Sequence, residues 1–307
     1  MADERAFTAG LGRFFGTGRG VLCGIGDDAA VVRNPAPNSV LCCDPVVEGV
    51  HFTRATPLRL VGRKAVNRNL ADLAAMGAVP DWLLLSLVLP SWCGPRQRRE
   101  LLHGVRAAAR AAGAIVVGGD VAATPGPLVA TVTAIGHAEG RVLTRSGARA
   151  GDTVHVTGPL GGSSLGQHLR FRPPLPEGAW LAAQRCVHAA MDVSDGFLLD
   201  LQTLLDASGG LGAEIDAAAV PIARAARRLA NGDADLALRH ALGDGEDHVL
   251  LWTQRRGADL PAGGPLAAAA RRPIGKVLAE PGLFLRREGC RIPVPALGYR
   301  HELADRR

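Results

Sequence analysis

The chain alternates short apolar segments with longer segments of helical period, and this alternation restricts it to a mixed α and β fold. Residues 39–44 (SVLCCD) and 114–120 (AIVVGGD) are predicted to be buried strands, and each of these segments finishes at an aspartate. Residues 60–77 and 96–113 are predicted to be helices, because their apolar residues recur with helical spacing and a glycine closes each of them. A further predicted strand, residues 127–136, completes this part of the chain.

A turn-rich segment, residues 137–152, separates the two halves of the chain. We place a boundary near Gly140 and expect two domains, residues 1–139 and 140–307, because 307 residues are enough for two buried cores. The second half repeats the alternation of strands and helices. Its expected elements are strands over 153–158, 188–192, 212–216 and 248–253, a helix over 195–207 and a proline-rich loop over 170–179.

The formal net charge of +6 does not by itself indicate a polyanionic partner. The positive residues are nearly all arginines, since Lys64 and Lys276 are the only lysines, and they alternate with alanine and acidic residues instead of forming one block. One tyrosine and seven phenylalanines leave few rings for stacking on bases. We therefore expect no nucleic-acid partner.

The six cysteines show no CxxC spacing, and most lie inside apolar segments where cysteine acts as a small hydrophobic residue. Reduced thiols are therefore expected. The opening residues MADERAFTAG carry acids where a signal peptide requires a basic and then an apolar stretch. The apolar segment 82–90 is too short to span a bilayer. These features predict a cytoplasmic protein that does not enter a membrane.

Seven aspartates share an unusual placement, because each lies at the end of an apolar strand, beside a glycine turn or inside an otherwise apolar helix. They are Asp27, Asp28, Asp44, Asp72, Asp120, Asp192 and Asp195. Asp72 follows Asn69 on one face of a predicted helix, so a polar strip crosses a surface that should be buried. Any one of these aspartates is explained by capping of a helix or turn. As a set, they predict a site at the carboxyl edge of a sheet.

Carboxylates that converge in this way repel one another unless a cation lies between them. One pair of like charges about 4 Å apart costs about 1 kcal/mol in water and roughly 4 kcal/mol at an effective dielectric constant of 20. Oxygen ligands without paired histidines or thiolates suit Mg²⁺, which commonly bridges carboxylates to phosphates. Bound Mg²⁺ and phosphate would explain why Asp27 and Asp28 are tolerated beside an apolar segment.

The chain has no GxxxxGK[ST] phosphate loop, since Gly275 and Lys276 are followed by valine, and it lacks the protein-kinase loop signatures. A nucleotide would therefore be held in another way. Arg145 lies in a glycine turn, where its planar guanidinium is suited to clamp a phosphate. Residues 158–164 (GPLGGSS) either offer backbone donors to an anion or form only a tight turn, and the sequence leaves both open.

Taken together, these segments resemble the thiamine-monophosphate kinase family, within the superfamily of aminoimidazole ribonucleotide synthase, selenophosphate synthase and the hydrogenase maturation dehydratase. The matching motifs cover nearly the whole chain in the expected order. They are GIGDDAAVV, CDPVVEGVHF, GRKAVNRNLADLAAMGA, VVGGD, VLTRSGARAGD, MDVSDGFLLDL, GDGEDHVLL and GYRH. EGVHF and LADLAAMGA are similar to the kinase branch more than to its relatives.

The resemblance implies an α+β (mixed α/β), two-domain aminoimidazole ribonucleotide synthase-like fold whose N-terminal domain pairs across a homodimer to close a β-barrel. It implies ATP-dependent phosphorylation of thiamine monophosphate to thiamine diphosphate. Because the acceptor phosphate is already ionised, we expect direct in-line attack on the γ-phosphate, supported by several Mg²⁺ ions. Neither a catalytic base nor a covalent phosphoenzyme is expected.

The resemblance also assigns roles by position. The implied Mg²⁺ ligands are Asp28, Asp44, Asp72, Asp120, Asp192 and Asp195, with Asp27 and Cys43 included beside them. The implied ATP contacts are Gly119, Asp120, Arg145 and Ser194, and the implied contacts to thiamine monophosphate are His51, Glu246 and Tyr299. Taken alone, a histidine such as His51 is more often a core histidine than a ligand contact, and Tyr299 is explained as a packing residue.

The chain departs from the family at several positions. Cys42 and Cys43 stand where serine or threonine usually precedes Asp44, and a thiol is a poorer Mg²⁺ ligand than a hydroxyl. The sequence leaves open whether one metal is lost or is held by backbone or water. Two alternatives to the kinase also stay open: a sister ATP-dependent enzyme that acts on another small substrate, and a non-catalytic nucleotide-binding protein.

Overall fold

A computed structural model describes residues 4–25, 30–34, 38–266 and 268–300 of the chain. The chain forms two compact units. The N-terminal unit comprises residues 1–73 and 78–140, and the C-terminal unit comprises residues 74–77 and 141–307.

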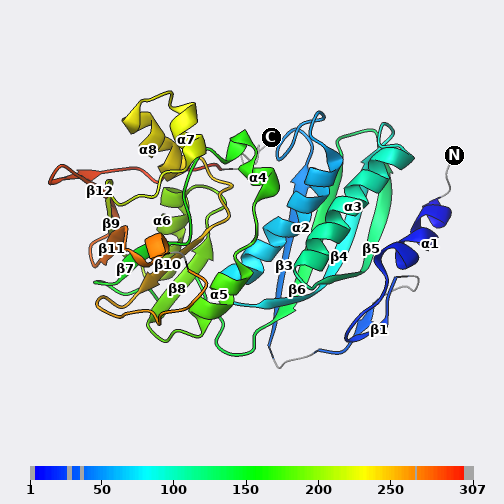
Figure 1. The fold of residues 1–307 in the computed structure, drawn as a ribbon, viewed down its shortest axis with the longest axis horizontal. Helices are drawn as coiled ribbons and strands as arrows, with labels where there is room; N and C mark the ends of the chain where they lie inside the picture. Colours follow the sequence, from blue (N-terminus) through cyan, green and yellow to red (C-terminus); the bar gives the residue numbers. More distant parts are fainter. Residues whose placement is uncertain (1–3, 26–29, 35–37, 267, 301–307) are drawn as a thin grey trace, which may run out of the picture. The chain divides into compact units, whose positions relative to one another are not determined.

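The N-terminal unit is built on a four-stranded sheet in the order β3-β6-β4-β5. Its strands are β3 (Ser39–Val47), β6 (Val129–His137), β4 (Val79–Pro90) and β5 (Ile115–Thr124). Strands β4 and β5 are parallel, whereas the other neighbours are antiparallel. Two helices, α2 (Leu58–Ala75) and α3 (Pro95–Ala111), lie along one face of the sheet, as Figure 1 shows. The unit begins with α1 (Glu4–Phe15), β1 (Val21–Cys23) and β2 (Val31–Val32).

Strand β4 shows why this sheet has one covered and one open face. Alternate residues of the strand are buried beneath the helices, whereas their neighbours on the other face are only half-buried. The buried set is Leu83, Leu85, Leu87 and Leu89, and the half-buried set is Leu84, Ser86 and Val88. The apolar segment 82–90 is therefore a central strand of the sheet, a role that the sequence analysis did not assign to it. The predicted helices and the predicted strands of this unit are confirmed.

Helices α2 and α3 approach each other closely at two glycines. A Cβ atom added at Gly62 of α2 would lie 2.1 Å from the carbonyl oxygen of Leu101. A Cβ atom added at Gly104 of α3 would lie 2.0 Å from the carbonyl oxygen of Arg59. Any larger residue at either position would push the helices apart, because backbone atoms cannot move aside as a flexible side chain can. This crossing fixes α2 against the sheet.

The C-terminal unit is built on a seven-stranded sheet in the order β13-β12-β9-β11-β7-β10-β8. Its strands are β7 (Thr153–Val156), β8 (Val187–Asp192), β9 (Gly212–Asp216), β10 (Leu250–Gln254), β11 (Gly275–Leu278), β12 (Gly282–Arg287) and β13 (Cys290–Pro293). Its helices are α4 (Gln167–Arg170), α5 (Leu175–Ala182), α6 (Phe197–Ala207), α7 (Arg224–Leu229) and α8 (Ala234–Gly243), with short 3-10 turns at Ser163–Leu165 and Ala268–Arg271.

Helix α6 supplies much of the core of this unit, because five of its apolar side chains have no exposed surface and pack in one cluster with the sheet. They are Phe197, Leu198, Leu201, Leu204 and Leu205. The predicted strands and the predicted helix over 195–207 are confirmed within one to three residues at their ends. The predicted loop over 170–179 is wrong in its second half, since α5 begins at Leu175. Proline at the first turn does not prevent a helix from starting there. Among the described helices, none is long and apolar enough to cross a membrane.

The glycine contact between α2 and α3 gives a testable prediction. Gly104→Ala should lower the free energy of unfolding by about 1–3 kcal/mol, because the new methyl group overlaps the backbone of α2. Gly10→Ala is the matched control, since it also lies in a helix and no described atom lies within 4 Å of its added Cβ. Chemical denaturation would measure both variants. Equal stability of Gly104→Ala and the wild type would contradict the close packing.

Candidate functional site

One group of predicted site residues lies between β3 and α2 in the N-terminal unit. The side-chain oxygen of Asn69 accepts a hydrogen bond from the backbone N–H of Asp44 at 2.9 Å, and its amide nitrogen donates to the carbonyl oxygens of Asp44 and Ala65. The Cys42 thiol donates to the Asn69 carbonyl oxygen at 3.2 Å and also interacts with the Asp72 carboxylate. Asp44 and Asp72 are therefore brought to the same face of the sheet. The predicted polar strip on this helix is real, and Asn69 is fully buried within it.

The two adjacent cysteines face opposite ways. Burial, together with the nearby Asp72 and Asp44 carboxylates, raises the pKa of the Cys42 thiol far above its ordinary value. Cys42 is therefore a neutral thiol that donates hydrogen bonds, whereas a metal ligand must be a thiolate. Cys43 points to the open face of the sheet, where it accepts a hydrogen bond from the Thr133 hydroxyl at 3.3 Å.

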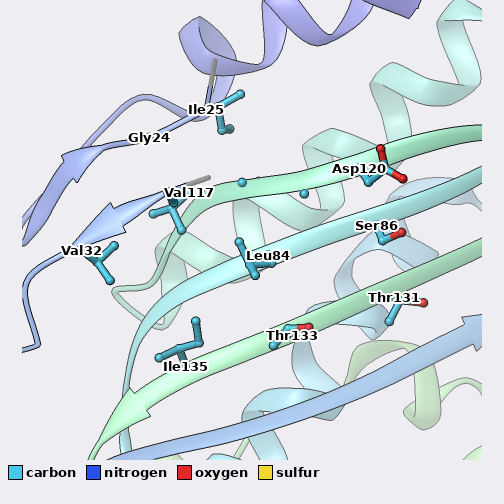
Figure 2. A pocket seen from close by; sticks show the side chains of 13 residues that line it. Gly24, Ile25, Val32, Leu84, Ser86, Val117, Asp120, Thr131, Thr133 and Ile135 are labelled. Carbon is cyan, nitrogen blue, oxygen red and sulfur yellow. The ribbon is translucent and has the colours of Figure 1, made fainter. Parts of the chain in front are cut away.

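The open face of the sheet carries a cavity of about 530 Å³ next to β1 and β2. Figure 2 shows Asp120 and Ser86 on neighbouring strands, with Thr131 beyond them, and the strand register places all three side chains on this face. Apolar side chains from Ile25 and Val32, among others, line the rest of the cavity. Asp120 therefore lies on the opposite face of the sheet from Asp44 and Asp72.

Gly119 is required by the backbone at this position. Its φ is +151°, and a Cβ atom added there would lie 1.9 Å from the carbonyl oxygen of Leu85 on the neighbouring strand. Asp44 and Asp120 also lie inside β3 and β5, whereas the sequence analysis placed both at strand ends. That part of the prediction is wrong, although both strands are edges of the sheet, where interruptions are tolerated.

His51 is half-buried and is held at three atoms. Its backbone N–H donates to the Val47 carbonyl oxygen at 2.9 Å, and its ring Nδ1 accepts from the Val47 N–H at 3.1 Å. The ammonium group of the fully buried Lys64 donates to the His51 carbonyl oxygen at 2.8 Å. Because Nδ1 accepts a backbone hydrogen bond, the ring proton lies on Nε2, and His51 presents a donor there.

In the C-terminal unit, a turn over residues 193–196 joins β8 to α6. Asp192 ends β8 and is only 3% exposed, whereas Asp195 is exposed. One oxygen of Asp200, Oδ2, accepts hydrogen bonds from three successive N–H groups, those of Ser194, Asp195 and Gly196. The sequence analysis missed Asp200. Its signal was an acid in the first turn of a helix that follows a glycine turn, where a side chain reaches back to unpaired N–H groups.

The same turn binds two other predicted site residues through its carbonyl oxygens. The Glu246 N–H donates to the Ser194 carbonyl oxygen at 2.7 Å, and the Tyr299 N–H donates to the Asp195 carbonyl oxygen at 2.8 Å. Main-chain hydrogen bonds thus join the turn to two segments that lie about fifty and one hundred residues further along the chain. The structure brings Ser194, Asp195, Glu246 and Tyr299 together.

The glycine-rich loop over residues 158–164 is a turn that binds carboxylates of this same chain. The Gly161 N–H donates to both oxygens of Asp247 at 2.9 and 3.0 Å, and the Gly162 N–H donates to Asp244 at 2.9 Å. Both glycines have positive φ angles, so their N–H groups point to the same side. Of the two interpretations that the sequence left open, the structure supports the tight turn, since internal carboxylates occupy these donors.

Two buried carboxyls in this unit have strongly perturbed acidities. Burial, followed by the charges of Asp192 and Asp195, raises the pKa of Asp200 to about 7. Burial, followed by the charge of Asp244, raises the pKa of Asp247 to about 7. Burial therefore favours the neutral form of both carboxyls, and the neighbouring aspartate charges favour it further.

Asp27 and Asp28 lie outside the described residues, and Arg145 is exposed on the surface of the C-terminal unit. Across the described part of the chain, no group of three or more histidine, cysteine, aspartate or glutamate side chains is arranged to hold a metal ion. Each unit by itself supplies a pair of aspartates: Asp44 with Asp72, and Asp192 with Asp195.

Comparison with known proteins places this fold in a class. Residues 26–138 match the family described as AIR synthase related protein, N-terminal domain. The solved structure of AaThiL complexed with AMPPCP and TMP superposes with a TM-score of 0.77 at 27% identity, covering 97% of each chain. The expected mixed α/β, AIR synthase-like fold is therefore confirmed.

Curated relatives identify the family within this class. Thiamine-monophosphate kinase of Rhodopirellula baltica is 42% identical over 241 residues, which cover 76% of each chain. Thiamine-monophosphate kinase of Salmonella typhimurium is 35% identical over 308 residues, which cover 92% of each chain. The chain belongs to the thiamine-monophosphate kinase family.

The raised pKa of Asp247 predicts how stability depends on pH. Its pKa is about 7 in the folded chain, against an ordinary value of 3.8, so its contribution to stability is complete below about pH 4 and is lost as the pH rises to 7. Asp247→Asn keeps an acceptor for the Gly161 N–H but cannot ionise. Between pH 5 and 8 the variant should therefore lose less unfolding free energy than the wild type, by about 2–3 kcal/mol.

Urea denaturation at several pH values would measure this difference. Asp259→Asn, which changes an exposed acid of the same unit, is the control and should follow the wild type. Parallel pH curves for Asp247→Asn and the wild type would show that the Asp247 carboxyl ionises normally in the folded chain.

Proposed function

We propose that this protein transfers the γ-phosphate of ATP to thiamine monophosphate and so forms thiamine diphosphate. The family relationship supports this activity over 92% of the chain. The observation that carries the proposal is the turn over residues 193–196, whose backbone joins the proposed nucleotide and metal residues Ser194 and Asp195 to the proposed acceptor residues Glu246 and Tyr299. A phosphoryl-transfer site needs this proximity, because catalysis there consists mainly of positioning and charge neutralisation.

The proposed acceptor group is a phosphate that is ionised at neutral pH, so the mechanism requires no general base. The tautomer of His51 fits this requirement, because its Nε2–H donates and cannot remove a proton. In the proposed mechanism His51, Glu246 and Tyr299 bind and orient thiamine monophosphate for in-line attack. Attack is direct, and no side chain becomes phosphorylated.

The proposed nucleotide contacts are Gly119, Asp120, Arg145 and Ser194. Gly119 and Asp120 line the cavity on the open sheet face, which has apolar walls suited to part of a nucleotide. The exposed guanidinium of Arg145 is free of the constraints of burial and suits a phosphate. Ser194 belongs to the turn described above.

The carboxylates of the chain fit Mg²⁺ by their chemistry. Burial raises the pKa of both Cys42 and Asp200, and the nearby charges of Asp72 and Asp44, and of Asp192 and Asp195, raise them further. Each pair of aspartates therefore creates a region that favours a cation. The proposed ligands are Asp27, Asp28, Asp44, Asp72, Asp120, Asp192 and Asp195. Bound Mg²⁺ would offset the repulsion between the two phosphate groups. Of the two cysteines, Cys42 is a neutral thiol and lacks the thiolate form of a metal ligand. Cys43 lies on the sheet face that bears Asp120 and remains a proposed ligand.

We also propose that the open face of the N-terminal sheet pairs with a second copy of the chain, as the family resemblance implies. Leu41 on edge strand β3 is 62% exposed on this face, and Ile135 of β6 lies opposite it in the register. Exposed apolar residues on an uncovered sheet face are typical of an interface.

Formation of thiamine diphosphate from ATP and thiamine monophosphate tests the proposed activity directly. The expected result is turnover that requires Mg²⁺. Turnover of aminoimidazole precursors without any activity on thiamine monophosphate would instead assign the chain to a sister enzyme. Binding of ATP without turnover under saturating Mg²⁺ would identify a non-catalytic protein.

Asp72→Asn should lower turnover by roughly 100-fold or more, because it removes a proposed ligand charge. Its thermal stability should equal or exceed that of the wild type, since a repelling charge is lost. Glu100→Gln, an exposed acid of the same unit, is the control and should change neither quantity. Marked unfolding of Asp72→Asn would instead indicate that Asp72 only caps local structure.

Leu41→Asp should convert the proposed dimer to a monomer, because it places a charge in an apolar interface. Sedimentation velocity would measure the change. Leu236→Asp, at an exposed leucine in the C-terminal unit, is the control and should leave the dimer intact. A monomeric wild-type protein at micromolar concentration would contradict the pairing.

A further inference from the structure

The turn over residues 193–196 is held by one buried side chain that has no role in the proposed chemistry. Oδ2 of Asp200 lies 3.0 Å from the Ser194 nitrogen and 3.1 Å from the nitrogens of Asp195 and Gly196. Asp200 is 2% exposed, so bulk water cannot replace this acceptor. A single oxygen therefore sets the direction of three successive peptide groups.

The opposite side of the turn is held just as tightly. Its carbonyl oxygens accept the N–H groups of Glu246 and Tyr299, at 2.7 and 2.8 Å. A Cβ atom added at Gly245 would lie 2.8 Å from the Ser194 oxygen, and one added at Gly298 would lie 2.8 Å from the Asp195 oxygen. The two outer segments touch the turn with their backbones, so a shift of the turn would move both of them.

We propose that Asp200 is a positioning residue, which fixes the turn over residues 194–196 and, through it, the segments that carry Glu246 and Tyr299. The inference rests on the proposed function, because that function assigns the nucleotide, metal and acceptor roles to these residues. Asp200 itself touches neither the reacting atoms nor the substrates. Its effect on the reaction passes through the backbone of the turn.

This role depends on an acceptor oxygen at this position and not on its charge. The amide oxygen of asparagine can accept the same three N–H groups, whereas alanine leaves them without a partner in a buried place. A metal ligand would need the charge of the carboxylate. Comparison of Asp200→Asn with Asp200→Ala therefore separates positioning from direct metal binding.

The experiment combines steady-state kinetics with hydrogen exchange on the full chain. Asp200→Ala should lower kcat/KM for both ATP and thiamine monophosphate, on the order of 10- to 100-fold, as removal of a residue that orients ligands typically does. Its amides at residues 194–196, 246 and 299 should exchange faster together, because one anchor holds all of them. Asp200→Asn should stay within about threefold of the wild type in both measurements.

Asp206→Ala is the matched control, because Asp206 is an exposed acid on the same helix whose side chain accepts a hydrogen bond from the Gln202 amide. It should leave the kinetics and the exchange of the turn unchanged. Binding of AMPPCP with Mg²⁺, measured by calorimetry, gives a readout that does not depend on turnover, and Asp200→Ala should weaken it by a similar factor.

Three results would overturn the proposal. They are an Asp200→Asn variant as impaired as Asp200→Ala, an Asp200→Ala variant that loses stability but keeps both KM values, and faster exchange at residues 194–196 without any change at 246 and 299. Failure of the proposed function is distinguishable. In that case the wild type forms no thiamine diphosphate, while Asp200→Ala still changes exchange at all five amides and weakens AMPPCP binding.

Discussion

The structure depends on holding carboxylates close together in spite of their mutual repulsion. In each unit, main-chain and amide groups hold the acids in place. Asn69 binds both backbone polar groups of Asp44, and Asp200 accepts three N–H groups from the turn that carries Asp195. The cost of this arrangement is visible in the raised pKa of Asp200 and of Cys42. In exchange for this unfavourable burial and repulsion, the fold holds a site that favours cations and, through them, phosphates.

The two units contribute different parts of the proposed chemistry. The N-terminal unit supplies a sheet with two functional faces. One bears Asp44 opposite α2, which carries Asp72, and the other bears the cavity with Asp120. The C-terminal unit supplies one turn on which backbone hydrogen bonds from distant segments converge. The glycines at the α2–α3 crossing and beside the turn serve the same purpose, because each permits backbone contact that any side chain would prevent.

Much of the fold followed from the sequence, because helices and strands with one buried face leave a clear period in the chain. Segment 82–90 was harder to assign, since a central strand buried on one face and half-covered on the other reads as a uniform apolar run. Asp44 and Asp120 were placed at strand ends, yet both strands continue beyond them. An aspartate at the end of an apolar segment does not show whether the strand and its hydrogen bonding to the neighbouring strand end there or continue.

The candidate site was predictable only in part. The sequence indicated which residue types matter, but the role of Asp200 depends on the path of the backbone around it, which no local pattern contains. The opposite directions of Cys42 and Cys43 likewise follow from the pleat of β3 and its register with β6. Contacts such as that between Glu246 and Ser194 join segments far apart in the chain and become visible only when the fold is known.

The central claim is that repulsion among the site carboxylates is relieved by divalent cations and phosphate together. Thermal unfolding of the full chain at pH 8, with and without Mg²⁺ and AMPPCP, tests it most directly. The account predicts that the two ligands together raise Tm by several degrees, well beyond the effect of sodium chloride at equal ionic strength. An unchanged Tm, or the same rise with sodium chloride alone, would contradict it.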